Sequence, residues 1–316
     1  MRDFFKLIRY KNLLIIILLQ CLVKFCIVNP LLDVYGLEPL FGGLDFIFMV
    51  TSTVLMAAGG YVINDYFDTQ TDSVNRPDEV VVGNGVSRSE AVNIHLILNI
   101  IACVLGFLVS FRIGVWIIGL AYPFISGLLW FYSATYKKQF LIGNIIVAFL
   151  TGLVPLLPAV YELPMQIAKN YDKIVEDEIN IYLIFYWAAG YGVFAAITTL
   201  AREIIKDWED CEGDKAAGRN SVPMVCGDFY TKIITLVLTL VSILGVVWVW
   251  LKYLTDTISA IYILLLVVAP FIFLFYKIIK IKSKEDCKFV KNLYKIIMIT
   301  GMLYMLVVRY NFLSLV

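Results

Sequence analysis

Long runs of apolar residues alternate with short polar segments along the whole chain. Nine of these runs approach the roughly 20 residues that a helix needs to cross the hydrocarbon core of a bilayer. The runs cover residues 12–31, 44–63, 91–111, 113–131, 141–160, 180–200, 230–251, 257–276 and 292–313. This pattern predicts an all-α, polytopic membrane protein with nine transmembrane helices in a bundle.

The composition also indicates a membrane protein. Of the 316 residues, 61% are hydrophobic and 16% are charged, whereas about 25% of the residues in a soluble domain are charged. A soluble fold of this size could not hide so much apolar surface. The net charge of +1 gives no indication of nucleic-acid binding, and no feature points to an obligate protein partner. The six cysteines contain no Cys-x-x-Cys pair, and we interpret them as reduced packing residues.

Lysine and arginine are distributed unevenly between the segments that join the runs. If the N-terminus is cytoplasmic, most of the 26 basic residues fall in cytoplasmic segments, as the positive-inside rule requires. We therefore expect the N-terminus inside and the C-terminus outside, in a bacterial or archaeal inner membrane. This topology places Lys24 on the outer side. It makes residues 161–179, which include Glu162, an outer loop that we interpret as a solvated cap without a function.

About half of the 25 acidic residues lie in two segments, 64–90 and 201–228. An even number of predicted helices separates the two segments, so both face the cytoplasm. This arrangement suggests a parallel repeat of a four-helix unit, about residues 12–138 and 141–276, followed by a ninth helix. We expect both repeats to belong to a single transmembrane domain that spans residues 1–316.

The first acidic segment follows directly from the second apolar run. If that helix continues, Asn64, Asp68 and Asp72 are spaced i, i+4, i+8, and Asp65 lies beside them on the same helical face. Pro77 then ends the helix. The second segment continues the sixth run and places Asp207, Asp210 and Asp214 at i, i+3, i+7, again on one face.

Carboxylates stacked at helical spacing repel one another, so a bound cation is expected to compensate. Carboxylate and amide oxygens are hard ligands that suit Mg²⁺, which binds a few carboxylates together with substrate phosphates. Two such faces could hold a diphosphate between metal ions, with nearby bases on its remaining oxygens: Arg76, Lys137, Arg202 and Lys206. Either segment alone could be a solvated loop, whereas two matching faces on one side favour a binding site. Neither segment matches an EF-hand, and the chain has no P-loop.

The motif Asn64-Asp65-x-x-Asp68-x-x-x-Asp72, followed by Asn75-Arg76-Pro77, resembles the first aspartate-rich motif of the UbiA-type intramembrane prenyltransferase superfamily. Asp207-x-x-Asp210-x-x-x-Asp214 resembles the second. The resemblance implies a bundle around a central cavity open to the cytoplasmic side and Mg²⁺-dependent transfer of a polyprenyl group from its diphosphate. It also implies two Mg²⁺ ions bridged by the diphosphate, with these metal ligands: Asn64, Asp65, Asp68, Asp72, Asp207, Asp210 and Asp214.

A third element lies between the fourth and fifth runs. The stretch from Tyr132 to Lys138, with Asn144 shortly after it, is similar to the Tyr…Lys element of the same family. The resemblance implies that Lys137 and Tyr132 are catalytic and that Asn144 helps to bind substrate. Without the other motifs, the stretch reads as a positive-inside anchor with interfacial aromatic residues. The family often has a second Arg after Asn-Arg-Pro, and this chain lacks it.

The acceptor is less constrained than the prenyl donor. The residues from Ala201 to Asp214 resemble the branch of the family that transfers geranylgeranyl to geranylgeranylglyceryl phosphate. Aromatic acceptors, as in quinone, haem or chlorophyll-tail pathways, remain the alternative. A secondary transporter is the alternative of another class, although its acids would be expected near the midplane of the membrane. The expected partners are therefore a prenyl diphosphate, a lipophilic acceptor and membrane lipid.

Overall fold

The computed structural model describes residues 2–314, which form helices and no β-strand. Within these residues, nine segments are long and apolar enough to cross a membrane. They are Tyr10–Val34, Gly43–Asn75, Arg88–Arg112, Trp116–Ala134, Ile142–Lys169, Leu183–Glu209, Val222–Tyr253, Thr257–Lys280 and Lys284–Leu313. The predicted all-α fold with nine spans is confirmed.

Several spans consist of more than one helical piece. In chain order the elements are α1 (Arg2–Leu7), α2 (Tyr10–Leu22), η1 (Val23–Val28), α3 (Asn29–Val34), α4 (Gly43–Asn75), η2 (Pro77–Glu79), α5 (Arg88–Arg112), α6 (Trp116–Gly119), α7 (Ala121–Ala134), η3 (Tyr136–Lys138), α8 (Ile142–Leu153), η4 (Val154–Leu156), α9 (Leu157–Lys169), α10 (Tyr171–Glu176), α11 (Leu183–Glu209), α12 (Cys211–Ala216), α13 (Val222–Tyr253), α14 (Thr257–Ile263), η5 (Leu264–Val268), α15 (Ala269–Lys280), α16 (Lys284–Leu303) and α17 (Met305–Leu313).

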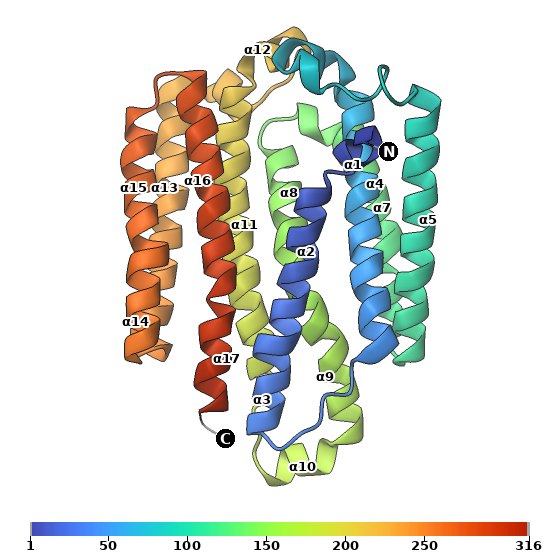
Figure 1. Cartoon of the computed structure of the whole chain (residues 1–316), viewed down its shortest axis with the longest axis vertical. Coiled ribbons are helices and arrows are strands. Elements are labelled where there is room, and N and C mark those ends of the chain that lie inside the picture. The colour runs from blue at the N-terminus through green and yellow to red at the C-terminus, as the bar shows by residue number, and fades with distance from the viewer. Residues whose placement is uncertain (1, 315–316) are drawn as a thin grey trace.

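The long helices run roughly side by side, and the short connecting elements gather at the two ends of the bundle (Figure 1). Helix α12 and the end of α4 lie at the upper end of the view, together with the start of the chain. Helix α10 and the end of α17 lie toward the opposite end. The two acidic segments therefore meet at one end of the bundle.

Local sequence explains where several helices begin or break. Ser87 and Glu90 form a capping box at the start of α5, which satisfies backbone N–H groups that have no partner within the helix. In the fifth span, Pro155 lies in the 3₁₀ turn η4 between α8 and α9. Proline lacks an N–H group and disrupts an α-helix interior, so the span changes direction there.

Helices α8 and α11 approach each other closely because glycines face one another across the contact. A Cβ atom at Gly152 would lie 2.9 Å from the carbonyl oxygen of Gly192, and one at Gly192 would lie 2.6 Å from that of Gly152. A side chain at either position would push the helices apart. This contact brings the start of α8 within hydrogen-bonding distance of the end of α11, where Asn144 meets Asp207.

The prediction that residues 161–179 form a solvated cap is wrong for Glu162, which is buried against Lys24. Both side chains are buried, and Lys24 Nζ lies 2.7 Å from Glu162 Oε2. The Glu162 carboxylate also accepts hydrogen bonds from the backbone N–H groups of Leu40 (2.7 Å) and Phe41 (3.1 Å). Residues 157–169 are helix α9 rather than part of a loop. Lys24 lies in the π-helical turn η1, and Glu162 ties that turn to the connection before α4.

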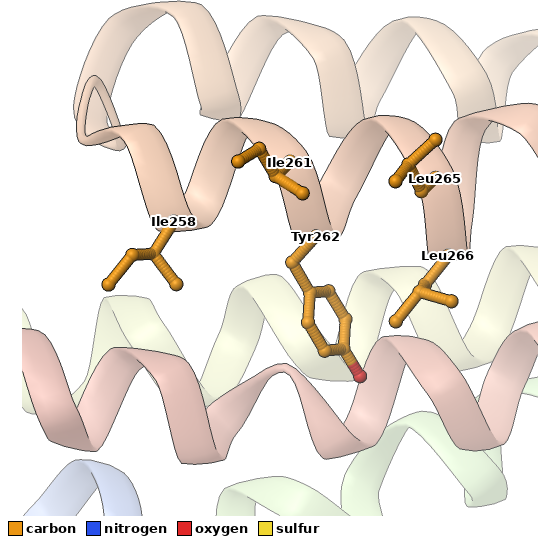
Figure 2. A pocket seen from close by; sticks show the side chains of 5 residues that line it. All are labelled: Ile258, Ile261, Tyr262, Leu265 and Leu266. Carbon is orange, nitrogen blue, oxygen red and sulfur yellow. The ribbon is translucent and has the colours of Figure 1, made fainter.

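A shallow recess lies on the surface of α14 and η5, away from the acidic segments. Figure 2 shows its lining, which consists of Ile258, Ile261, Tyr262, Leu265 and Leu266. The Tyr262 hydroxyl donates a hydrogen bond to the carbonyl oxygen of Thr300, at 2.9 Å. Because the lining offers no charged group, this recess is not suited to bind a diphosphate.

Candidate active site

The end of α4 supplies one side of a polar cluster. The helix continues to Asn75 and stops before Pro77, as the sequence predicted. Asn64 and Asp68 are both buried, and Asn64 Nδ2 donates to Asp68 Oδ2 at 2.8 Å. Asp65 is paired instead with Arg9 from the start of the chain, at 2.7 Å.

Lys137 lies against this face from the turn η3. Its Nζ atom donates to Asn64 Oδ1 at 2.9 Å and forms an ion pair with Asp68. Burial lowers the pKa of Lys137, and the Asp68 carboxylate opposes that fall. Gly143 allows the approach, because a Cβ atom there would lie 2.9 Å from Lys137 Cα. The structure thus brings Lys137 to the first acidic motif.

Arg219 connects the two acidic segments, and the sequence did not single it out. Its guanidinium forms an ion pair with Asp68 and lies 3.3 Å from Asp214 Oδ1. Only 9% of its side chain is exposed. Burial opposes a high pKa at Arg219, but Asp68 and Asp214 outweigh it and raise the pKa. The only signal in the sequence is a base after Gly218, which has a φ of +64°, a backbone conformation typical of glycine in turns.

The second acidic segment is divided between two helices. Helix α11 ends at Glu209, and Asp210 has non-helical backbone angles before α12 begins. Asp207 accepts a hydrogen bond from Asn144 Nδ2 at 2.7 Å, whereas Asp210 accepts two from Arg76, at 2.6 and 2.8 Å. The prediction that Asp207, Asp210 and Asp214 share one continuous helical face is therefore wrong. Each of these acids is still bonded to another predicted site residue or to Arg219.

Asn75 fixes the break between α11 and α12. Its side chain donates to the carbonyl oxygen of Asp210 at 3.1 Å and accepts from the N–H group of Gly213 at 3.0 Å. A Cβ atom at Gly213 would overlap the Asn75 amide. The end of α4 thus holds the second acidic segment in place.

Arg202 and Lys206 lie on α11 beside Glu203, a buried acid that the sequence analysis did not select. Glu203 accepts from Arg202 at 2.5 Å and from Lys206 at 3.5 Å. Tyr132 is half-buried and has Glu203, Asp68 and Asp207 as electrostatic neighbours. Tyr132 therefore lies near both Glu203 on α11 and Asp68 of the first acidic motif.

Asp68, Asp210 and Asp214 are paired with bases, and Asp207 is bonded to Asn144, so the acids are not gathered around one point. Within residues 2–314, no three acidic, cysteine or histidine side chains converge closely enough to hold a metal ion. Burial raises the pKa of Asp214, and Arg219 opposes that rise. The donor set still fits Mg²⁺, since carboxylate and amide oxygens from both segments face the positions of Lys137 and Arg219.

Comparison with known proteins identifies the family to which the chain belongs. Residues 22–298 match the model of the UbiA prenyltransferase family. The chain belongs to this family. A UbiA prenyltransferase transfers a prenyl group, so the protein is an enzyme of the class that transfers alkyl groups other than methyl. The nine apolar spans make it an integral membrane protein.

Individual relatives of this UbiA prenyltransferase are archaeal. The chain is 30% identical over 246 residues to the digeranylgeranylglyceryl phosphate synthase of Methanothermobacter thermautotrophicus, covering 77% of this chain and 78% of that protein. A solved structure concerned with digeranylgeranylglyceryl phosphate synthase is similar, with a TM-score of 0.66, 24% identity and 98% of each chain covered. A UbiA homolog from Archaeoglobus fulgidus bound to GPP and Mg²⁺ has a TM-score of 0.54 and 13% identity, covering 96% of this chain and 99% of that one.

Proposed function

We propose that the protein transfers a geranylgeranyl group from its diphosphate to the free hydroxyl of geranylgeranylglyceryl phosphate, with Mg²⁺ as cofactor. The observation that carries this proposal is the convergence of both acidic motifs, Lys137 and Arg219 in one buried cluster. The archaeal relatives are digeranylgeranylglyceryl phosphate synthases, which supports the choice of donor and acceptor.

The metal would be held by oxygens from both helices. The proposed ligands are Asn64, Asp68 and Asp72 on α4 and Asp207, Asp210 and Asp214 on α11 and α12, with two ions shared by the diphosphate. Asp65 is a weaker candidate, because Arg9 occupies its carboxylate. When bound, Mg²⁺ would neutralise the negative charge that develops on the departing diphosphate.

The bases of the cluster complete the diphosphate site. Lys137 and Arg219 are already turned toward Asp68, and Arg76 lies at the rim beside Asp210. Each can exchange a carboxylate partner for a phosphate oxygen, which is a charge-assisted contact of the same kind. Such contacts favour departure of the diphosphate if they strengthen as its charge grows. Tyr132, which lies near the same acids, would border the reacting carbon.

The prenyl chain would extend between the apolar spans, in a central cavity that opens to the cytoplasm. We place the end that carries the acidic segments and the start of the chain in the cytoplasm (Figure 1), with the C-terminus outside. The basic residues gathered in the segments at this end support that orientation.

Product formation by purified protein tests the proposal. Labelled geranylgeranyl diphosphate and geranylgeranylglyceryl phosphate should give the diether lipid with Mg²⁺ present and none with EDTA. Asp207→Ala should lose nearly all turnover, whereas Asp172→Ala, at an exposed acid on α10, should not. An aromatic acceptor that reacts faster than the glyceryl lipid would replace the proposed acceptor.

A further inference from the structure

The proposed acceptor carries a second anion. Its free hydroxyl and its phosphate are joined by a short stretch of the same glycerol, so the phosphate must lie close to the attacking oxygen. The diphosphate already uses Lys137, Arg219 and Arg76 in the proposed function. A second set of bases next to these is therefore needed if the acceptor's phosphate is recognised at all.

Such a set surrounds Glu203. This carboxylate is buried, accepts from Arg202 and Lys206, and also has Lys137 and Arg9 as electrostatic neighbours. Lys137 and Arg9 are already paired with Asp68 and Asp65, whereas Arg202 and Lys206 share the single carboxylate of Glu203. Two bases on one acid leave a local excess of positive charge. Glu203 precedes Asp207 by four residues on α11, which places it one helical turn, about 6 Å, deeper in the bundle. The excess charge thus lies next to the diphosphate site, on the membrane side of it.

Arg202 has a donor that the protein does not use. Its terminal nitrogen binds Glu203, but its Nε–H group is buried and has no hydrogen-bond partner among the described residues. Buried donors are nearly always paired, because an unpaired one loses its bond to water without replacement. An arginine has donors enough to keep Glu203 and bind a phosphate oxygen through Nε.

Lys295 on α16 adds a base from another helix. Its Nζ atom donates to the neutral Asn12 Oδ1 at 3.1 Å, and no carboxylate in the described part of the chain lies within ion-pair distance of it. By contrast, Lys291, one turn earlier on the same helix, is paired with Glu209. Lys295 also has Arg202 and Lys11 as electrostatic neighbours. Lys295 on α16 thus has bases of α2 and α11 in its neighbourhood.

We propose that Arg202 and Lys295, with Lys206 beside them, form the binding site for the phosphate group of the lipid acceptor. This inference rests on the proposed function. It assigns Arg202 and Lys206 to the acceptor rather than to the diphosphate of the donor. It also explains how the enzyme distinguishes a phosphate-bearing lipid from an uncharged one, since a dianion offsets the excess positive charge and an alcohol does not.

The test compares two acceptors in one enzyme. Initial rates are measured with geranylgeranylglyceryl phosphate and with the corresponding phosphate-free geranylgeranylglycerol, at saturating geranylgeranyl diphosphate and Mg²⁺. The wild-type protein should prefer the phosphate-bearing lipid. Arg202→Gln and Lys295→Gln should each reduce that preference, measured as the ratio of the two kcat/KM values, by roughly 10- to 150-fold, as expected for loss of a charged hydrogen bond.

Control variants separate a binding role from a structural one. Lys288→Gln removes an exposed charge two turns before Lys295 on the same helix, and the preference should stay as in the wild type. Arg202→Lys should recover part of the preference. If Arg202→Gln does not fold, because Glu203 loses a partner, Lys295→Gln still decides the question, since Lys295 is bonded to a neutral amide.

Several outcomes would overturn the inference. Equal losses with both acceptors would make the residues structural, and a matching rise in KM for geranylgeranyl diphosphate would assign them to the donor. Inorganic phosphate should compete with the phosphate-bearing lipid more strongly than with the alcohol; equal inhibition would mean that it occupies the diphosphate site. If the wild-type protein uses neither glyceryl lipid, the proposed function fails first, and that failure is visible before any variant is made.

Discussion

Lys137 and Lys138 are neighbours in η3, but their side chains have different surroundings. Lys137 contacts Asn64 and Asp68 and is 14% exposed, whereas Lys138 is exposed to solvent. A charged contact that strengthens in the transition state contributes roughly 1.5–3 kcal/mol, or about 10- to 150-fold in rate. We therefore expect Lys137→Ala to lower kcat by that factor and Lys138→Ala to have little effect, as measured by prenyl transfer in detergent.

Two further results would refine the role of Lys137. Lys137→Arg keeps the charge and should lose less activity than the alanine variant. Wild-type kinetics in both alanine variants would mean that η3 only anchors the chain at the membrane interface. The diphosphate would then be bound by Arg219 and Arg76.

Replacing Arg219 should change the affinity for metal and the affinity for diphosphate in opposite directions. Its positive charge holds Asp68 and Asp214 in the absence of metal, so Arg219→Gln should free these oxygens and tighten the binding of Mn²⁺, used as a probe for Mg²⁺, by roughly tenfold. The same variant should bind inorganic diphosphate more weakly in the presence of the metal. Both affinities can be measured by electron paramagnetic resonance of Mn²⁺.

Lys215→Gln is the matched control for Arg219, because it removes an exposed charge from the neighbouring helix α12. It should change neither affinity. A loss of both affinities in Arg219→Gln would show that Arg219 only maintains the shape of the loop.

At the level of helices, sequence predicted the first acidic segment better than the second. The face of Asn64 and Asp68 follows from an uninterrupted helix that stops before Pro77, and both features are local. The break at Asp210 is caused by Asn75, which lies 135 residues earlier in the chain. The sequence around Asp210 does not indicate this contact, so helical periodicity alone predicted the wrong local geometry. It also predicted no role for Arg219.

The solvated position predicted for Glu162 is wrong for the same reason, because its partner Lys24 is distant in the sequence. Each charge taken singly suggests the end of a span, and only the folded chain shows that the two meet. Breaking such a pair leaves an uncompensated buried charge and costs roughly 3–5 kcal/mol. Glu162→Ala should therefore destabilise the protein by about that amount, measured by thermal or denaturant unfolding in detergent.

The exposed acid Glu176 on α10 provides a control, and Glu176→Ala should leave stability nearly unchanged. The double variant Lys24→Met, Glu162→Gln removes both charges and retains an acceptor for the backbone of residues 40 and 41. It should recover most of the loss. If it is as unstable as Glu162→Ala, the backbone contacts of Glu162 matter more than its charge.

For the whole molecule, hydropathy located all nine spans but not their ends. Helix α4 has 33 residues, well beyond the roughly 20 needed to cross the bilayer core. The 32 residues of α13 include a kink at Gly227, which separates its polar start from the apolar part. Their polar turns outside the core carry no apolar signal, so the predicted runs stop early. The single domain and its two four-helix repeats stay predictions.

Orientation in the membrane can be tested by labelling single cysteines with an impermeant maleimide, in a background where the six native cysteines are replaced. Asp172→Cys on α10 and Ser314→Cys should react from outside. Asn84→Cys and Glu212→Cys, at the end that carries the acidic segments, should react only after the membrane is opened. The reverse labelling pattern would show that the orientation in the membrane is opposite to the proposed one. The substrates would then bind from the outer side.

The ion pairs that fill the site have a consequence for the energised membrane. Asp65, Asp68, Asp210 and Asp214 are each matched by a base before any ligand enters. In the proposed complex, the positive charge of two Mg²⁺ ions nearly balances the negative charge of the diphosphate and of the acceptor's phosphate taken together. The ligands that enter therefore bring little net charge. Transmembrane voltage does work only on net charge, at about 2.3 kcal/mol per elementary charge for 100 mV across the full bilayer. Lipid synthesis by this enzyme should therefore continue at an unchanged rate when the membrane potential collapses.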